Sequence, residues 1–151
     1  MQKSVLIKIR RYCAYQERCH SEVRYKLIEL GARGLELEDY IVHLIAEDFL
    51  NEERFAQVYA GGKFRVLKWG KQKIVHGLKQ KQVSAYCIKK GLQEIPDDDY
   101  ETTLTKLVEG KWENLRKPML SLAVKQKILT YMLGKGYEQQ LVRAAIAKLK
   151  K

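Results

Sequence analysis

Lys71-Gln72-Lys73-Ile74 recurs as Lys125-Gln126-Lys127-Ile128, and this repetition decides the fold class. Downstream of each copy, an apolar residue is followed five positions later by another, as in Leu78 with Val83 and in Met132 with Tyr137. A polar helix start and a further helical pattern come next in both places. Self-similarity of this kind is the sequence signature of a tandem-repeat architecture.

The first third of the chain follows the same plan more loosely. Ser21-Glu22-Val23-Arg24 stands in the place of the tetrapeptide, and Gly34-Leu35 closes the turn. Between them, the apolar face is supplied by Leu27, Ile28 and Leu30. Ser21 is the expected N-cap, because its hydroxyl can accept from the unpaired amides of the first turn.

Each unit is predicted to contain three short helices, since apolar residues recur at helical spacing and strict alternation is rare. The first helix covers about residues 3 to 16, the second unit begins at the N-cap Asn51, and the third begins at Pro96. Pro118 and Tyr137 are expected to open the last two helices. The predicted fold is therefore all-α, with about nine helices in tandem three-helix repeats over residues 1–50, 51–94 and 95–151. Such repeats bury part of one another's faces and form an elongated, curved body.

Composition places the chain among globular proteins of a reducing compartment. It has 151 residues, of which 46% are apolar and 31% charged. Cys13, Cys19 and Cys87 are odd in number and form no short pair, which argues against a disulfide framework. No segment approaches the ~20 apolar residues of a membrane span. We expect a cytoplasmic monomer without membrane association.

The residues offer no convergent catalytic set. Of the three histidines, His20 and His43 lie in the first unit and His76 in the second, and none has a partner at ligand spacing. Gly61-Gly62-Lys63 is too short for a phosphate-binding loop and lies inside a helical pattern. The triple aspartate at residues 97–99 fits a helix start better than a cation site. The sequence therefore predicts no enzyme, no metal and no cofactor.

The positive charge is concentrated in two stretches. The net charge is +11, and no acidic residue occurs from Phe55 to Gln93. From Asn114 onward, Glu138 is the only acid against nine bases. A solvated lysine-rich face is the alternative, but acids are normally interspersed to limit self-repulsion. An anionic partner is favoured: nucleic acid, an anionic membrane face or an acidic protein would each satisfy it.

Lysine exceeds arginine in this run, which favours contacts to phosphates over contacts to base edges. The expected interface consists of Lys63, Arg65, Lys68, Lys71, Lys73, Lys79, Lys81, Lys125 and Lys127. Among the nearby aromatic residues, Tyr59 and Phe64 are expected in the core. Trp69 precedes Gly70 in a connection, where a ring could stack on an unpaired base.

Four stretches resemble one known family over nearly the whole chain. They are His20-Ser21-Glu22-Val23-Arg24-Tyr25-Lys26-Leu27, Ala46-Glu47-Asp48-Phe49-Leu50-Asn51-Glu52-Glu53-Arg54-Phe55-Ala56, Lys68-Trp69-Gly70-Lys71-Gln72-Lys73-Ile74, and the C-terminal Lys125-Gln126-Lys127-Ile128 with Leu133-Gly134-Lys135-Gly136-Tyr137. In this order they resemble the RecX family of recombination regulators. The resemblance implies tandem three-helix repeats that bind within the groove of the RecA–DNA filament. It also implies modulation, usually inhibition, of ATP-driven strand exchange by RecA in DNA repair.

The chain departs from the family pattern at two glycine-containing places. The turn Gly31-Ala32-Arg33-Gly34 is expected to be enlarged, and Gly61-Gly62 falls where the family helix continues. Two other functions remain open beside a RecA regulator that also contacts single-stranded DNA through its phosphates. One is a sequence-nonspecific DNA-binding structural protein, and the other is an adaptor that recognises acidic helices.

Overall fold

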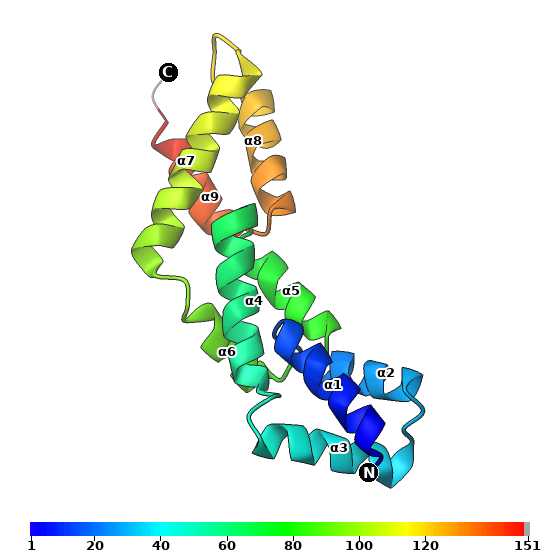
Figure 1. Ribbon diagram of the computed structural model, residues 1–151. Coiled ribbons are helices and arrows are strands. Elements are labelled where there is room, and N and C mark those ends of the chain that lie inside the picture. The colour runs from blue at the N-terminus through cyan, green and yellow to red at the C-terminus, as the bar shows by residue number, and fades with distance from the viewer. Residues whose placement is uncertain (150–151) are drawn as a thin grey trace. The chain divides into compact units, whose positions relative to one another are not determined.

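The computed structural model describes residues 1–149, and these fold into nine helices without a strand (Figure 1). In chain order the helices are α1 (Lys3–Tyr15), α2 (His20–Glu29), α3 (Gly34–Ala46), α4 (Glu52–Leu67), α5 (Lys71–Gln80), α6 (Ala85–Leu92), α7 (Asp97–Leu115), α8 (Leu122–Gly134) and α9 (Gln139–Ala147). The predicted all-α fold of three-helix repeats is confirmed. The repeat boundaries at residues 50 and 94 stay predictions.

The second helix of every repeat ends in the same turn. A residue with positive φ follows the helix at Gly31 (95°), Gln82 (63°) and Gly136 (97°). The next residue is buried, and its N–H donates to the carbonyl five positions earlier, at 3.0 Å for Ala32 to Leu27, 3.1 Å for Val83 to Leu78 and 3.2 Å for Tyr137 to Met132. This is the hydrogen bond of a left-handed helix end. The apolar pairs seen in the sequence are therefore the two ends of this hydrogen bond.

The first repeat has the same turn, but at an earlier position in the chain than expected. Its turn closes at Gly31 and Ala32, because Gly34 already begins α3 and Leu35 is 85% exposed. The residue that matches the tetrapeptide isoleucines is Val23. Val23, Ile74 and Ile128 are all completely buried. Four residues join the second and third helices in each repeat, so this turn is as long as the other two, and its enlargement relative to the family stays a prediction.

Helix starts follow the predicted caps at some places and not at others. Asn51 accepts a hydrogen bond from the Arg54 amide at 2.9 Å, as expected of an N-cap. Ser21 is not a cap: α2 begins one residue earlier, and the Ser21 hydroxyl donates to the Lys81 carbonyl at 2.7 Å. Pro118 lies in the connection before α8, where Ser121 caps the helix.

The two other predicted starts are one or two residues early. Pro96 is the N-cap residue of α7, not its first helical residue. Tyr137 precedes α9, which begins at Gln139, and its ring is completely buried. Tyr137 is thus a core residue of the turn.

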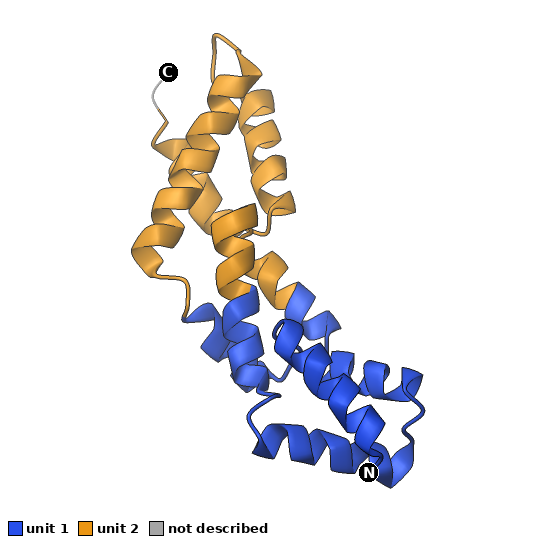
Figure 2. Ribbon diagram, viewed as in Figure 1, with its two compact units in different colours: residues 1–59, 77–93 blue, residues 60–76, 94–151 orange. Residues whose placement is uncertain are grey.

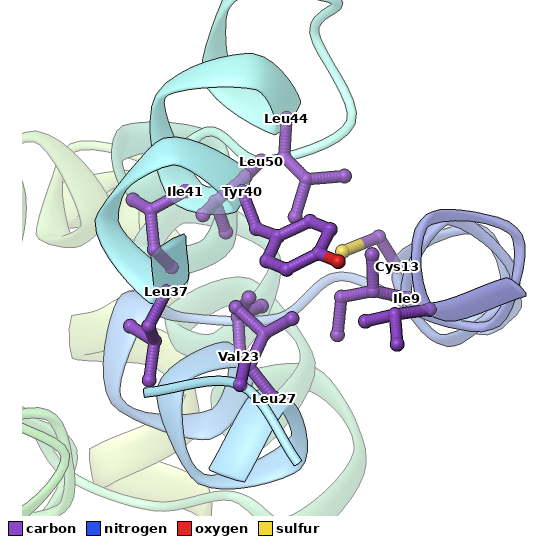
Figure 3. Packing of buried hydrophobic residues seen from close by; sticks show 11 residues of the cluster. Ile9, Cys13, Val23, Leu27, Leu37, Tyr40, Ile41, Leu44 and Leu50 are labelled. Atoms are coloured by element: carbon purple, nitrogen blue, oxygen red, sulfur yellow. The ribbon is translucent and has the colours of Figure 1, made fainter. Parts of the chain in front are cut away.

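The core of the first repeat is built around one tyrosine. The ring of Tyr40 from α3 lies among Ile9 and Cys13 of α1 and Val23 and Leu27 of α2 (Figure 3). Its hydroxyl accepts from the Gln2 amide at 2.7 Å, so the polar end of this buried side chain is satisfied. Burial raises the pKa of the Cys13 thiol to about 11, which makes it an inert core residue.

The helices group into two compact units that do not follow the repeat boundaries (Figure 2). Unit 1 contains residues 1–59 and 77–93, and unit 2 contains residues 60–76 and 94–151. The middle repeat is divided because the second helices of the first and second repeats each begin against the turn of the following repeat. In unit 1 this contact is Ser21 with Lys81; in unit 2 the N–H of Gln72 donates to the Gly136 carbonyl at 2.9 Å.

The glycine pair Gly61-Gly62 lies inside α4, which continues through it. The two glycines have different surroundings. A Cβ on Gly61 would lie 2.8 Å from the Arg65 guanidinium nitrogens, whereas a Cβ on Gly62 would meet no atom within 4 Å. A close side-chain approach therefore exists at Gly61 alone.

Candidate nucleic-acid interface

The two units differ strongly in charge. Unit 2 carries 16 lysines and arginines against 8 acids, a net charge of +8. Unit 1 carries 13 bases against 10 acids, a net charge of +3. Seven of the nine predicted interface residues belong to unit 2, and only Lys79 and Lys81 belong to unit 1.

In unit 2, Lys63 and Lys73 both lie near the ring of Trp69 in the connection between α4 and α5, residues 68–70, and Lys68 is part of this connection. Lys68 has a positive φ of 59°, and the Trp69 amide donates back to the Lys63 carbonyl at 3.2 Å. The Lys68 amide donates to the Phe64 carbonyl at 3.0 Å, which is the single hydrogen bond of a left-handed helix end, and the Trp69 bond reaches one residue further back. The positive φ of Lys68 turns the chain at the end of α4, and Trp69 lies immediately after this turn.

The turn between α8 and α9 holds this connection in place. The Tyr137 hydroxyl donates to the Lys68 carbonyl at 2.8 Å, and the Lys135 ammonium donates to the Leu67 carbonyl at 3.2 Å. The Gly70 amide donates to the Lys135 carbonyl at 2.7 Å. All three bonds link residues more than 60 positions apart, so the connection is fixed by tertiary structure.

Two glycines permit this approach. A Cβ on Gly70 would lie 2.3 Å from the carbonyl carbon of Gly136, which is backbone and cannot move aside cheaply. A Cβ on Gly136 would lie 2.4 Å from the Cβ of Lys73, and Gly136 has a φ of 97°. Both positions therefore require glycine.

The ring of Trp69 lies within reach of two ammonium groups. The Nζ of Lys73 is 4.7 Å and the Nζ of Lys63 is 5.0 Å from the ring centroid, both within the range of cation–π attraction. Trp69 is half-buried, Lys63 is half-buried on α4, and Lys73 is exposed on α5. The structure thus combines an aromatic ring with two of the predicted cations.

The remaining predicted residues of unit 2 differ in their contacts with the rest of the protein and in their exposure. Lys71 lies 3.7 Å from the exposed Asp97 carboxylate and 4.6 Å from the Tyr100 ring centroid. Lys68 donates to the Arg65 carbonyl at 2.8 Å, and Arg65 itself is exposed. Lys125 and Lys127 lie on α8, half-buried and exposed, and among residues 1–149 neither has a carboxylate within salt-bridge distance.

In unit 1, Lys79 is exposed on α5, whereas Lys81 is engaged with the protein itself. The Lys81 ammonium donates to Glu22 at 3.1 Å. Burial alone would lower the pKa of Lys81, but its hydrogen bond to Glu22 raises it above the ordinary value. Lys81 is therefore part of the contact between the first two repeats, and its charge is paired within the protein.

Two cations outside the predicted set lie over a further aromatic ring of unit 2. The Nζ of Lys111 is 4.8 Å and the Nζ of Lys135 is 5.9 Å from the centroid of Tyr131. Lys135 also holds the connection at residues 68–70, through its bond to the Leu67 carbonyl. The sequence signal for Lys135 is its place between Gly134 and Gly136 in the recurring turn.

A groove of about 350 Å³ between α7 and α9 is a different kind of surface. Its lining includes the apolar side chains of Leu104 and Leu141, the acids Asp97, Glu101 and Glu138, and the bases Lys71 and Lys148. With three acids against two lysines, the groove is not the uniformly basic surface that a phosphate backbone favours, although unit 2 as a whole is basic. The candidate nucleic-acid interface is therefore the region around Trp69.

A metal site and a membrane span both have structural requirements that the described part of the chain does not meet. Within residues 1–149, no three histidine, cysteine, aspartate or glutamate side chains gather closely enough to hold a metal ion. No helix in this range is long and apolar enough to cross a membrane.

The fold defines a class of protein: an all-α protein of tandem three-helix repeats, here with a net charge of +8 on unit 2. A family model described as the second three-helix domain of RecX matches residues 51–92. This model, the curated relatives and the solved structures all support the RecX family for this chain.

Curated relatives in bacteria agree with this assignment. The chain is 30% identical over 129 residues to the regulatory protein RecX of Clostridium perfringens strain 13, covering 85% of this chain and 60% of the relative. It is 31% identical over 119 residues to that of Clostridium acetobutylicum, covering 77% and 55%. The chain spans about half to three-fifths of the length of these relatives.

Solved structures show the same fold. The crystal structure of RecX from Lactobacillus salivarius superposes with a TM-score of 0.88 at 21% identity, over 97% of this chain and 94% of that one. A second crystal structure, of a regulatory protein RecX, gives a TM-score of 0.83 at 18% identity, over 96% and 71%.

Proposed function

We propose that this protein is a regulatory protein without enzymatic activity, which binds the RecA–DNA filament and inhibits ATP hydrolysis and strand exchange by RecA. It acts in the cytoplasm as a monomer during DNA repair and recombination. Similarity to the RecX family supports the regulatory role. The observation that carries the interaction with a filament is the net charge of +8 on unit 2.

The physical basis of binding is the phosphate backbone. Lysines that neutralise phosphates release condensed counterions, and this gives affinity without sequence preference. Six of the proposed interface residues have no carboxylate partner within residues 1–149. They are Arg65, Lys68, Lys73, Lys79, Lys125 and Lys127. Their charge is available to an external anion.

The test is DNA-dependent ATP hydrolysis and strand exchange by RecA of the source organism, with and without this protein. Inhibition at or below a one-to-one ratio is expected. The variant K73Q/K127Q should inhibit less, while the charge-matched control K3Q/K8Q, on the exposed side of α1, should inhibit like the wild type. No effect of the wild-type protein at equal ratio contradicts the proposal.

A DNA-binding structural protein without a dedicated protein partner is the second candidate, since the charge of unit 2 favours any polyanion. It predicts the same affinity for naked DNA and for a RecA-coated filament. Comparing the two affinities at one salt concentration separates the candidates.

A further inference from the structure

We propose that Trp69 is a stacking site for an unpaired nucleobase, so that unit 2 distinguishes single-stranded from duplex nucleic acid. This inference rests on the proposed phosphate binding and adds a contact to the base. It is carried by the proximity of the Trp69 ring to Lys63 and Lys73, whose ammonium groups lie 5.0 and 4.7 Å from the ring centroid.

The ring is presented on a fixed support. Hydrogen bonds from Tyr137 and Lys135 hold the carbonyls of Lys68 and Leu67, and the Gly70 backbone contacts the Gly136 backbone. A binding residue on such a support loses little conformational freedom when its ligand arrives, and this favours affinity.

Trp69 is not needed to complete the aromatic core of unit 2. That core consists of Phe64, Tyr100 and Tyr137, with centroids 5.9 Å apart for the first pair and 5.2 Å apart for the second. Within residues 1–149 no aromatic ring stacks on Trp69, and the ring remains half-buried. Its described contacts at the ring are the two lysines.

The lysines and the ring are suited to different parts of one nucleotide strand. Cation–π contacts at an exposed site are weaker than the stacking of a base on an aromatic ring. A strand can therefore replace the lysines at the ring with a base, while the displaced ammonium groups reach the neighbouring phosphates. The flexible stem of lysine permits this rearrangement.

The same chemistry excludes a duplex from full contact. In a duplex each base is already stacked and paired, so Trp69 finds no free face and only the phosphate contacts remain. The expected ligand is a single strand of either sugar and any sequence, since every base has a flat face.

The first experiment needs no change at Trp69. The variant W112F leaves Trp69 as the only tryptophan, because the chain contains two. Three probes of equal length are titrated: a thymidine oligonucleotide, an abasic oligonucleotide with the same phosphates, and a duplex. Stacking should quench the Trp69 emission with the thymidine strand only. It should also make this strand bind roughly 5- to 150-fold tighter than the abasic one.

The second experiment compares how much affinity each variant loses for each of the three probes. W69A should bind the thymidine strand no more tightly than the abasic strand. It should keep its affinity for the abasic strand and the duplex within about twofold. W69F should retain most of the tighter binding of the thymidine strand. K73Q should weaken all three probes and lower the salt slope for the single strands by about 0.7. Far-UV circular dichroism of each variant reports whether the helices are intact.

Three results separate the two proposals. Equal affinity of the wild-type protein for thymidine and abasic strands overturns the stacking site and leaves phosphate binding in place. An equal loss by W69A on all three probes also overturns it, because Trp69 then only positions lysines. Absence of binding to every probe overturns the DNA contact itself, and with it the stacking site.

Discussion

Two lysines of the acid-free run, Lys73 and Lys81, have the same chemistry but different surroundings. Lys81 is bonded to Glu22, whereas Lys73 is exposed and has no carboxylate within salt-bridge distance in residues 1–149. We expect K81Q to lower the free energy of unfolding by about 0.5–1 kcal/mol, since the pair is partly exposed. K73Q loses its cation–π contact with the Trp69 ring and should weaken DNA binding, which K81Q should leave unchanged. Urea unfolding and a binding titration of both variants check this, and a greater loss of DNA affinity for K81Q than for K73Q would contradict it.

The Lys81–Glu22 pair also predicts a pH dependence. Burial by itself raises the pKa of Glu22, but hydrogen bonds from the Cys19 amide and the Lys81 ammonium outweigh burial and lower it below 4.5. Its stabilising contribution is therefore present above pH 4.5 and is lost as the pH falls through the lowered folded-state pKa. Urea unfolding between pH 6 and pH 3, chosen around that ordinary value, should show a smaller loss of stability for E22Q than for the wild type. Identical slopes for the two proteins would rule out this contribution.

The adjacent glycines of α4 provide a third residue-scale prediction. An added Cβ at Gly62 meets no atom within 4 Å, and the residue is helical. G62A should therefore stabilise the protein by up to about 1 kcal/mol, through the helix propensity of alanine. G61A should gain less, because its Cβ must displace the Arg65 guanidinium. Thermal unfolding of the two variants measures the difference, and a larger gain for G61A would be the contrary outcome.

At the scale of elements, the contact between the α4–α5 connection and the α8–α9 turn depends on the absence of side chains. A Cβ at Gly70 would collide with the Gly136 backbone at 2.3 Å. We expect G70A to destabilise the protein by about 1–3 kcal/mol, as overpacking does elsewhere. The control is G134A, at the last residue of α8, where a Cβ meets nothing within 4 Å. Comparable stability of both variants in urea would mean that the connection can move aside.

Elements with local signals can be predicted from the sequence, and elements fixed by distant contacts cannot. The prediction of Asn51 as a cap is confirmed because its partner is three residues away. The prediction for Ser21 is wrong because its hydroxyl bonds to Lys81, sixty positions on. Pro118 fits a helix start by its fixed φ, yet Ser121 offers the stronger local cap.

The same distinction applies to the candidate site. The basic run itself is visible in the sequence, because charge needs no structure to be counted. The pairing of Lys81 with Glu22 and the support of residues 68–70 by Lys135 and Tyr137 join distant parts of the chain. Neither follows from spacing, so the availability of each predicted cation is defined only by the structure.

For the whole molecule, the uneven charge of the two units predicts an uneven response to charge removal. Unit 2 carries +8 and unit 1 carries +3, although both contain exposed lysines. If binding were driven by net charge alone, any three lysines would contribute equally. If it is driven by a surface of unit 2, position matters, and salt dependence measures the number of phosphates engaged.

The variant K73Q/K125Q/K127Q removes three charges from unit 2, and the control K3Q/K8Q/K89Q removes three exposed charges from unit 1. Removing one phosphate interaction with single-stranded DNA lowers the log–log slope of affinity against salt by about 0.7, so the slope of the first variant should fall by up to about 2. The control should keep the wild-type slope, with at most a small uniform decrease in affinity. Affinities measured at several salt concentrations check both. Equal decreases in slope would show that the protein attracts DNA through its overall charge, because a defined surface in unit 2 requires the two variants to differ.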